Sequence, residues 1–140
     1  MHQHGPRWVT VLLGELAMPV AISERVAVVV EDDMAMRQAI ERVLNARGIP
    51  VLAFDSAESA IGAGAASRAA CMVVDIKLPG LSGFEFYEAL GARPPVIFIT
   101  ADDDPAVAER ARRLGAAGFF HKPFSGRSLA DLVASLWGTP

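Results

Sequence analysis

Five short apolar runs, separated by longer segments of helical spacing, constrain the fold of this chain more than any other feature. The runs cover residues 26–30, 51–54, 71–74, 95–99 and 117–120. The valine-rich run at 26–30 is typical of a strand that is covered on both faces. Strands of this kind belong to parallel sheets, which carry helices on both sides.

The segments between these runs have the spacing and the end signals of helices. They are residues 34–47, a segment that starts after Ser56, and residues 83–90, 105–114 and 128–137. Gly48 follows the first segment as a stop signal, Ser56 suits an N-cap, and Pro105 suits a first helical turn. The sequence therefore predicts an α/β fold in which five parallel strands alternate with five helices through right-handed crossovers.

The length of 140 residues is enough for one domain with a real core. The alternating strands and helices occupy residues 24–138, and no output domain is expected in addition to them. Residues 1–23 are expected to form a loosely ordered N-terminal extension, with an added strand or a docking helix as the alternative. Met18 could equally be the start of translation.

Composition excludes several classes of protein. The single cysteine, Cys71, excludes an intramolecular disulfide and a cysteine-cluster zinc site, and it fits a reducing compartment. No run reaches the roughly 18 apolar residues of a membrane helix. A net charge of −3 argues against non-specific nucleic-acid binding. We therefore expect a cytoplasmic protein with neither a membrane nor a nucleic acid as a direct partner.

Polar residues follow the ends of four predicted strands. Glu31-Asp32-Asp33 follows the first strand, and Asp75, Thr100 and Lys122 follow the third, fourth and fifth. Each has an ordinary structural explanation, as a helix cap, a β-former or a solvated lysine. The carboxyl ends of parallel strands, however, meet at one edge of a sheet, where such folds bind their ligands.

This combination of groups suits phosphoryl transfer. Converging carboxylates repel one another unless a cation lies between them, and hard oxygen ligands suit Mg²⁺. Lys122 would add a fixed positive charge, and Thr100 a hydroxyl donor. Metal, ammonium and hydroxyl together stabilise a transferring phosphoryl group. Asp75 lies on the central strand and is the natural nucleophile for an aspartyl-phosphate.

Four motifs carry a resemblance to a known family. Residues 29–33 (VVEDD), 73–83 (VVDIKLPGLSG), 97–101 (IFITA) and 119–124 (FFHKPF) resemble the receiver domain of two-component response regulators. The match covers residues 24–138. It implies a flavodoxin-like three-layer sandwich with strand order 2-1-3-4-5. Residues 54–58 (FDSAE) look most like receivers of nitrogen-fixation and nodulation regulators, which normally carry a DNA-binding domain.

The resemblance implies a role for each site residue. Asp75 corresponds to the phospho-acceptor. The Mg²⁺ ligands would be Asp75, Asp32, Glu31 through a water molecule, and the backbone carbonyl of Lys77. Arg37 sets this register, because many members carry Arg at that place in the first helix.

The switch residues are implied in the same way. Thr100 corresponds to the switch hydroxyl, Phe119 to the switch aromatic, and Lys122 to the lysine that pairs with the phosphate. Lys77 and Asp102 occupy positions that tune the lifetime of the phosphate in this family. They could pair across the mouth of the site and impede water, or they could be two solvated side chains.

The resemblance also implies partners. The phosphoryl donor would be a sensor histidine kinase or a histidine phosphotransfer protein. The readout face would comprise residues 105–137, which would bind a downstream protein or form a phosphorylation-dependent dimer. The protein would be a phospho-acceptor rather than a turnover enzyme. The alternatives are a receiver fragment of a longer DNA-binding regulator and, remotely, an aspartate-nucleophile phosphatase of the haloacid-dehalogenase type.

Overall fold

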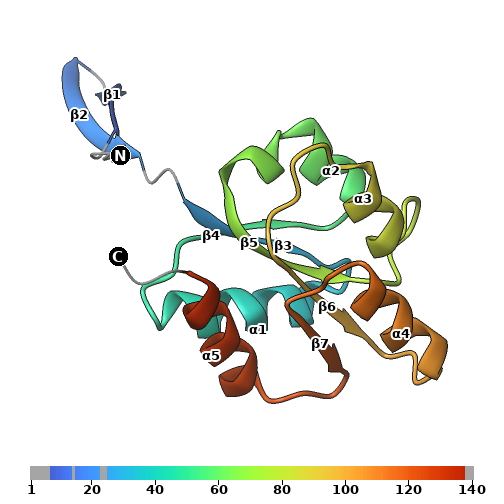
Figure 1. Cartoon of the computed structure of the whole chain (residues 1–140). Coiled ribbons are helices and arrows are strands. Elements are labelled where there is room, and N and C mark those ends of the chain that lie inside the picture. Colours follow the sequence, from blue (N-terminus) through green and yellow to red (C-terminus); the bar gives the residue numbers. More distant parts are fainter. Residues whose placement is uncertain (1–6, 14, 23–24, 138–140) are drawn as a thin grey trace, which may run out of the picture.

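The computed structural model describes residues 7–13, 15–22 and 25–137, and its centre is a five-stranded parallel sheet (Figure 1). The strands lie in the order β4-β3-β5-β6-β7. Their bounds are β3 Val26–Val30, β4 Val51–Phe54, β5 Ala69–Asp75, β6 Val96–Thr100 and β7 Gly118–His121. Numbered from β3, this order is 2-1-3-4-5, so the predicted topology is confirmed.

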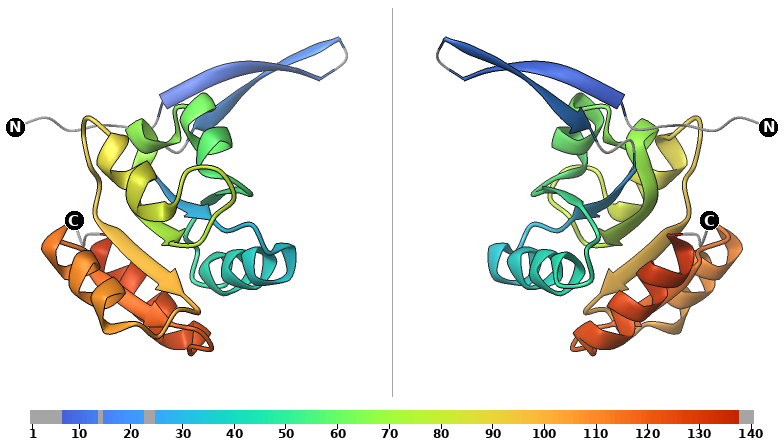
Figure 2. Two further views of the ribbon diagram at one scale, coloured as in Figure 1. Left: turned by 90° about the vertical axis from the view of Figure 1, so that its right-hand side faces the viewer. Right: turned by 90° about the vertical axis from the view of Figure 1, so that its left-hand side faces the viewer.

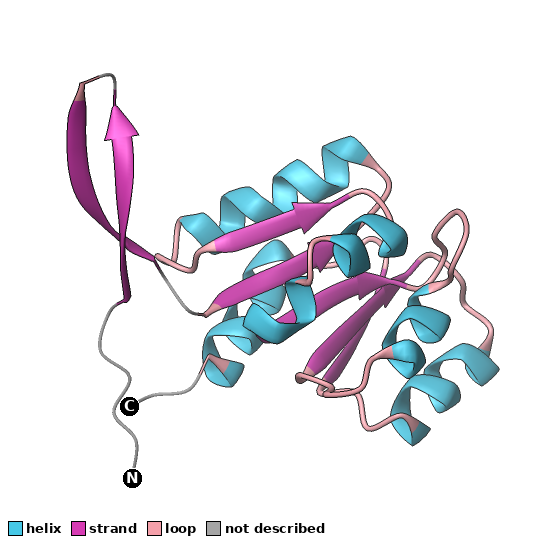
Figure 3. Ribbon diagram, turned by 90° about the horizontal axis from the view of Figure 1, so that it is seen from above, coloured by secondary structure: helices cyan, strands magenta, loops and turns pink. Residues whose placement is uncertain are grey.

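Five α-helices in the described part of the chain cover both faces of this sheet (Figure 3). They are α1 Met34–Asn45, α2 Ala57–Gly62, α3 Gly83–Ala89, α4 Pro105–Arg113 and α5 Gly126–Leu136. One apolar cluster joins the sheet to α1 and α5, and a second joins its other face to α2, α3 and α4. The three central strands are buried almost throughout, as their apolar runs predicted.

Side-chain caps determine where the helices begin. Asp33, Ser56, Ser82, Asp104 and Ser125 each accept a hydrogen bond from a backbone N–H of the first turn. Three predicted bounds were wrong by two residues. The third strand begins at Ala69 rather than at residue 71. The first helix ends at Asn45 rather than at residue 47, and the last begins at Gly126 rather than at residue 128 because Ser125 supplies its N-cap.

The N-terminal segment forms an antiparallel ribbon of its own (Figure 2). Strand β1 Arg7–Leu13 pairs with β2 Leu16–Ile22 over seven residues each, and neither strand joins the five-stranded sheet. The described residues of this segment therefore form two strands, with Glu15 in a turn before the second. The expected boundaries at residues 23–24 and 138 lie outside the described residues. No helix in the described ranges is long and apolar enough to span a membrane.

Candidate functional site

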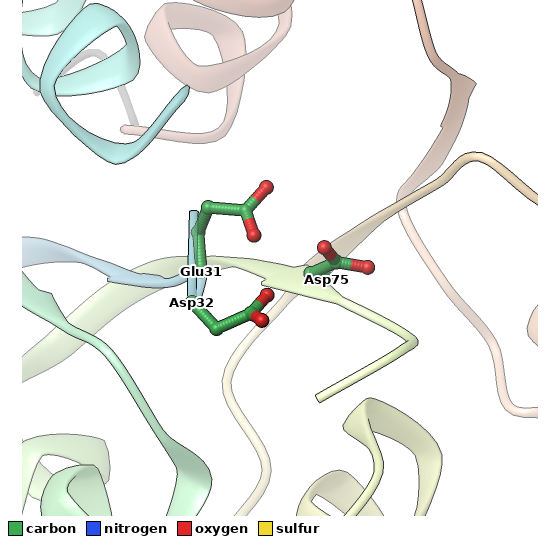
Figure 4. A group of neighbouring side chains, drawn as sticks. All are labelled: Glu31, Asp32 and Asp75. Atoms are coloured by element: carbon green, nitrogen blue, oxygen red, sulfur yellow. The ribbon is translucent and has the colours of Figure 1, made fainter. Parts of the chain in front are cut away.

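Three carboxylates gather at the carboxyl ends of β3 and β5 (Figure 4). They belong to Glu31, Asp32 and Asp75, and one oxygen of each lies within 4.8 Å of the others. Glu31 is 0% exposed and Asp75 is 4% exposed, whereas Asp32 lies at the surface. The site is thus a buried acidic pair that is open to solvent on the side of Asp32.

Lys122 lies between the two buried acids. Its Nζ donates to Glu31 Oε1 at 2.7 Å and to Asp75 Oδ2 at 2.9 Å. Burial of the ammonium lowers its pKa, but the hydrogen bonds and the attraction to both carboxylates outweigh burial, so the pKa of Lys122 is raised overall. Lys122 therefore holds a fixed positive charge beside Asp75.

One ammonium does not neutralise three carboxylates, and the remaining repulsion affects the pKa of Glu31. Burial and the neighbouring Asp75 raise the pKa of Glu31 to about 7, although the hydrogen bond from Lys122 opposes that rise. A divalent cation with oxygen ligands would relieve this repulsion. The carboxylates of Glu31, Asp32 and Asp75 provide hard oxygen donors, and the exposed Asp32 leaves one side of the site open. Both features suit Mg²⁺.

The backbone around Asp75 is fixed by its own loop. Asp75 Oδ1 accepts from the Lys77 amide at 3.0 Å, and the Gly83 amide donates to the Ile76 carbonyl at 2.8 Å. A Cβ at position 83 would lie 2.4 Å from the Asp75 carbonyl oxygen. Position 83 therefore needs glycine because α3 begins directly against the backbone of Asp75.

A series of hydrogen bonds leads from Thr100 into α4. Thr100 is 0% exposed, and its Oγ1 accepts from the Asp102 amide at 3.0 Å. Asp102 Oδ1 accepts from the Asp104 amide at 3.0 Å, and Asp104 Oδ1 accepts from the Ala106 amide at 2.9 Å. Each side chain thus holds the backbone two residues further on, up to the first turn of α4.

The other predicted site residues lie close to this edge, with one difference from the expected contacts. Phe119 is half-buried on β7 and packs on the face of the sheet that carries α3 and α4. Lys77 is exposed and forms no ion pair with Asp102, whose carboxylate instead accepts from the Asp104 amide. Of the two alternatives left open for these residues, the structure shows no ion pair across the mouth of the site.

Two contacts concern residues outside the predicted ligand set. Arg37 Nη1 donates to the Glu31 carbonyl at 2.9 Å, so the residue that set the register of the acidic pair also holds its backbone. Glu58 Oε2 accepts from the Leu81 amide at 2.9 Å. From the sequence, Glu58 is distinguished only as part of the FDSAE stretch at 54–58, and that stretch carries no signal of this contact across 23 residues.

Comparisons with known proteins agree with this geometry. The sequence profile described as "Response regulator receiver domain" matches residues 27–134. The chain is 35% identical over 118 residues to Nodulation protein W of Bradyrhizobium diazoefficiens, covering 82% of this chain and 52% of the relative. It is 34% identical over 113 residues to Transcriptional regulatory protein FixJ of Azorhizobium caulinodans, covering 79% and 54%.

A solved structure shows the same fold. A response regulator receiver protein from Burkholderia phymatum superposes with a TM-score of 0.72 at 34% identity, covering 83% of this chain and 97% of that one. The chain thus matches nearly all of a solved receiver but spans about half the length of the curated relatives named above.

Proposed function

The chain belongs to the family of response-regulator receiver domains, and we propose that it accepts a phosphoryl group on Asp75 from a phosphohistidine. The donor would be a sensor histidine kinase or a histidine phosphotransfer protein. The observation that carries the proposal is the buried Asp75 carboxylate, held by the Lys122 ammonium and adjacent to Glu31 and Asp32.

The chemistry follows from these groups. A carboxylate oxygen of Asp75 attacks phosphorus, the P–N bond of the phosphohistidine breaks, and the imidazole leaves with a proton from solvent. Lys122 balances the charge that remains on the phosphoryl oxygens. Glu31, Asp32, Asp75 and the Lys77 carbonyl would hold Mg²⁺, which when bound neutralises further phosphoryl charge.

The phosphorylated state then differs in charge and in contacts. The new phosphate brings about −1.5 to −2 charges. The Thr100 hydroxyl donates to a phosphoryl oxygen, and Phe119 turns inward toward the space that Thr100 leaves. The face made by α4, β7 and α5 changes as a result, and it binds a downstream protein or a second copy of the chain.

We propose that the protein acts in the cytoplasm as a switch that catalyses its own phosphorylation and dephosphorylation, and not as a turnover enzyme on a separate substrate. A second candidate concerns output. FixJ is named as a transcriptional regulatory protein, and this chain spans about half of it, which favours a receiver that works within or beside a DNA-binding regulator.

Incubation with acetyl phosphate and Mg²⁺, followed by intact mass measurement, tests the acceptor. We expect an adduct of about 80 Da on the wild-type chain and none on Asp75→Ala. EDTA should prevent the adduct, since the metal ligands would then be empty. An adduct that survives Asp75→Ala would overturn the assignment of the acceptor.

A further inference from the structure

Glu58 connects α2 to the loop that follows the acceptor. This residue lies in the first turn of α2, and its Oε2 accepts from the Leu81 amide at 2.9 Å. Leu81 belongs to the loop at 76–82, between Asp75 and the start of α3. Because Glu58 accepts this hydrogen bond through a carboxylate, the bond is charge-assisted and roughly twice as strong as a neutral one.

Gly80 shows that the loop is shaped around this carboxylate. Its φ is +75°, a conformation that glycine adopts at little cost. A Cβ at this position would lie 2.3 Å from Glu58 Oε2, with a second carboxylate atom at 3.0 Å. Any side chain at position 80 would therefore displace Glu58. The contact depends on both residues, one on α2 and one in the loop.

Few other hydrogen bonds hold this part of the loop. The Lys77 amide donates to Asp75 Oδ1, directly before it, and the Ser82 amide donates to Glu85 of α3, directly after it. Among the described hydrogen bonds of residues 77–82, the one to Glu58 is the bond that reaches another part of the fold. Leu78 is part of the apolar core and Leu81 packs against it, and Glu58 adds the hydrogen bond that ties the middle of this loop to α2.

We propose that Glu58 is a positioning residue for the Mg²⁺ site. The inference rests on the proposed function, in which the Lys77 carbonyl of this loop completes the ligand set. By fastening the loop to α2, Glu58 lowers the conformational freedom of that backbone before the metal binds. Groups that hydrogen-bond a metal ligand directly typically contribute about 10- to 100-fold to metal affinity, and Glu58, which bonds Leu81 instead of Lys77, should contribute no more than the lower end of that range.

The hydrogen bond between Glu58 and the Leu81 amide can be tested without any metal. Amide hydrogen exchange by NMR should show a protected Leu81 amide in the wild-type chain and a faster-exchanging one in Glu58→Ala. Glu58→Gln keeps a neutral acceptor and should restore part of the protection. Glu41 is the matched control, because it lies on α1 and makes no side-chain hydrogen bond or ion pair among the described residues. Glu41→Ala should leave the Leu81 amide unchanged.

Calorimetric titration with MgCl₂ then tests the effect on the site. We expect the Kd for Mg²⁺ to rise about tenfold in Glu58→Ala, at the lower end of the range for such groups, and less in Glu58→Gln. Glu41→Ala removes the same charge and should leave the Kd near that of the wild type. Circular dichroism of each variant checks that the fold is retained.

The outcomes separate the two proposals. If the wild-type chain binds no Mg²⁺, the proposed function fails, and the inference fails with it. If the wild-type chain binds Mg²⁺ and Glu58→Ala binds it equally well, only the inference is overturned. Gly80→Ala gives an independent measure: the positive φ strains it in either background, but in the wild-type chain its Cβ also meets Glu58, so it should weaken Mg²⁺ binding more there than in Glu58→Ala. Equal weakening in both backgrounds would contradict the inference.

Discussion

Raising the pH should destabilise the metal-free protein because of Glu31. This carboxyl is fully buried, and its pKa is about 7 in the folded protein against 4.5 as an ordinary glutamate. The folded state therefore binds more protons than the unfolded state between these two values. Stability then falls as the pH rises through this window.

The two pKa values of Glu31, in the folded and the unfolded protein, determine how much stability is lost. At 1.36 kcal/mol for each pKa unit, the full loss is about 3 kcal/mol, and about 2 kcal/mol of it falls between pH 5.5 and 8.5. With an m-value of about 2 kcal/mol/M, the midpoint of urea unfolding should fall by about 1 M over that range. Under the proposed function Mg²⁺ binds the folded state, so Mg²⁺ added at pH 8.5 should recover stability.

Urea titrations in EDTA at a series of pH values, followed by circular dichroism, provide the assay. Glu31→Gln removes the titrating carboxyl but keeps the shape of the side chain. The urea midpoint of this variant should therefore depend less on pH, and the variant should be more stable than the wild type at pH 8.5. Glu41→Gln is the matched control and should follow the wild type. Equal pH dependence in the wild type and Glu31→Gln would refute the reasoning.

Three further outcomes are expected. Gly83→Ala should lose about 1–3 kcal/mol of stability in thermal melts, because its Cβ would lie 2.4 Å from the Asp75 carbonyl oxygen; an unchanged Tm would contradict this. Arg110→Ala should lose no more than about 1 kcal/mol, because its ion pair with Glu88 is exposed; a loss above about 2 kcal/mol would show that the pair is coupled to the core. Lys77→Ala should leave the half-life of the aspartyl-phosphate, followed by intact mass, nearly unchanged, because Lys77 is exposed and forms no ion pair with Asp102; a several-fold shorter half-life would show that Lys77 impedes water.

The central fold could be predicted from the sequence because its strands are short, apolar and regularly separated. Buried parallel strands require such runs, and Val26–Val30 is buried at every position. The convergence of Glu31, Asp75 and Lys122 followed from topology, since parallel strands end at one edge of the sheet. These predictions used only periodicity and chain direction.

Contacts that depend on exact backbone positions could not be predicted. The Glu58 carboxylate meets the Leu81 amide only because the loop turns at Gly80, and nothing local to residue 58 signals this. The last helix begins earlier than expected because Ser125 caps it, despite the low helix propensity of Gly126. The sequence left open whether Lys77 and Asp102 form a pair, and in the structure Asp102 accepts from a backbone amide two residues further on.

The hydrogen bond between Thr100 and the Asp102 amide has a consequence for the resting population of the switch. If the Thr100 hydroxyl turns toward a phosphate on Asp75, it no longer accepts the hydrogen bond from the Asp102 amide, and that amide must find another partner. One hydrogen bond is worth about 0.5–1.5 kcal/mol, which corresponds to roughly a two- to tenfold bias between two states. In the switch proposed above, this bond would help to hold the unphosphorylated chain in the conformation described here, and α4 would be the first helix to receive the change.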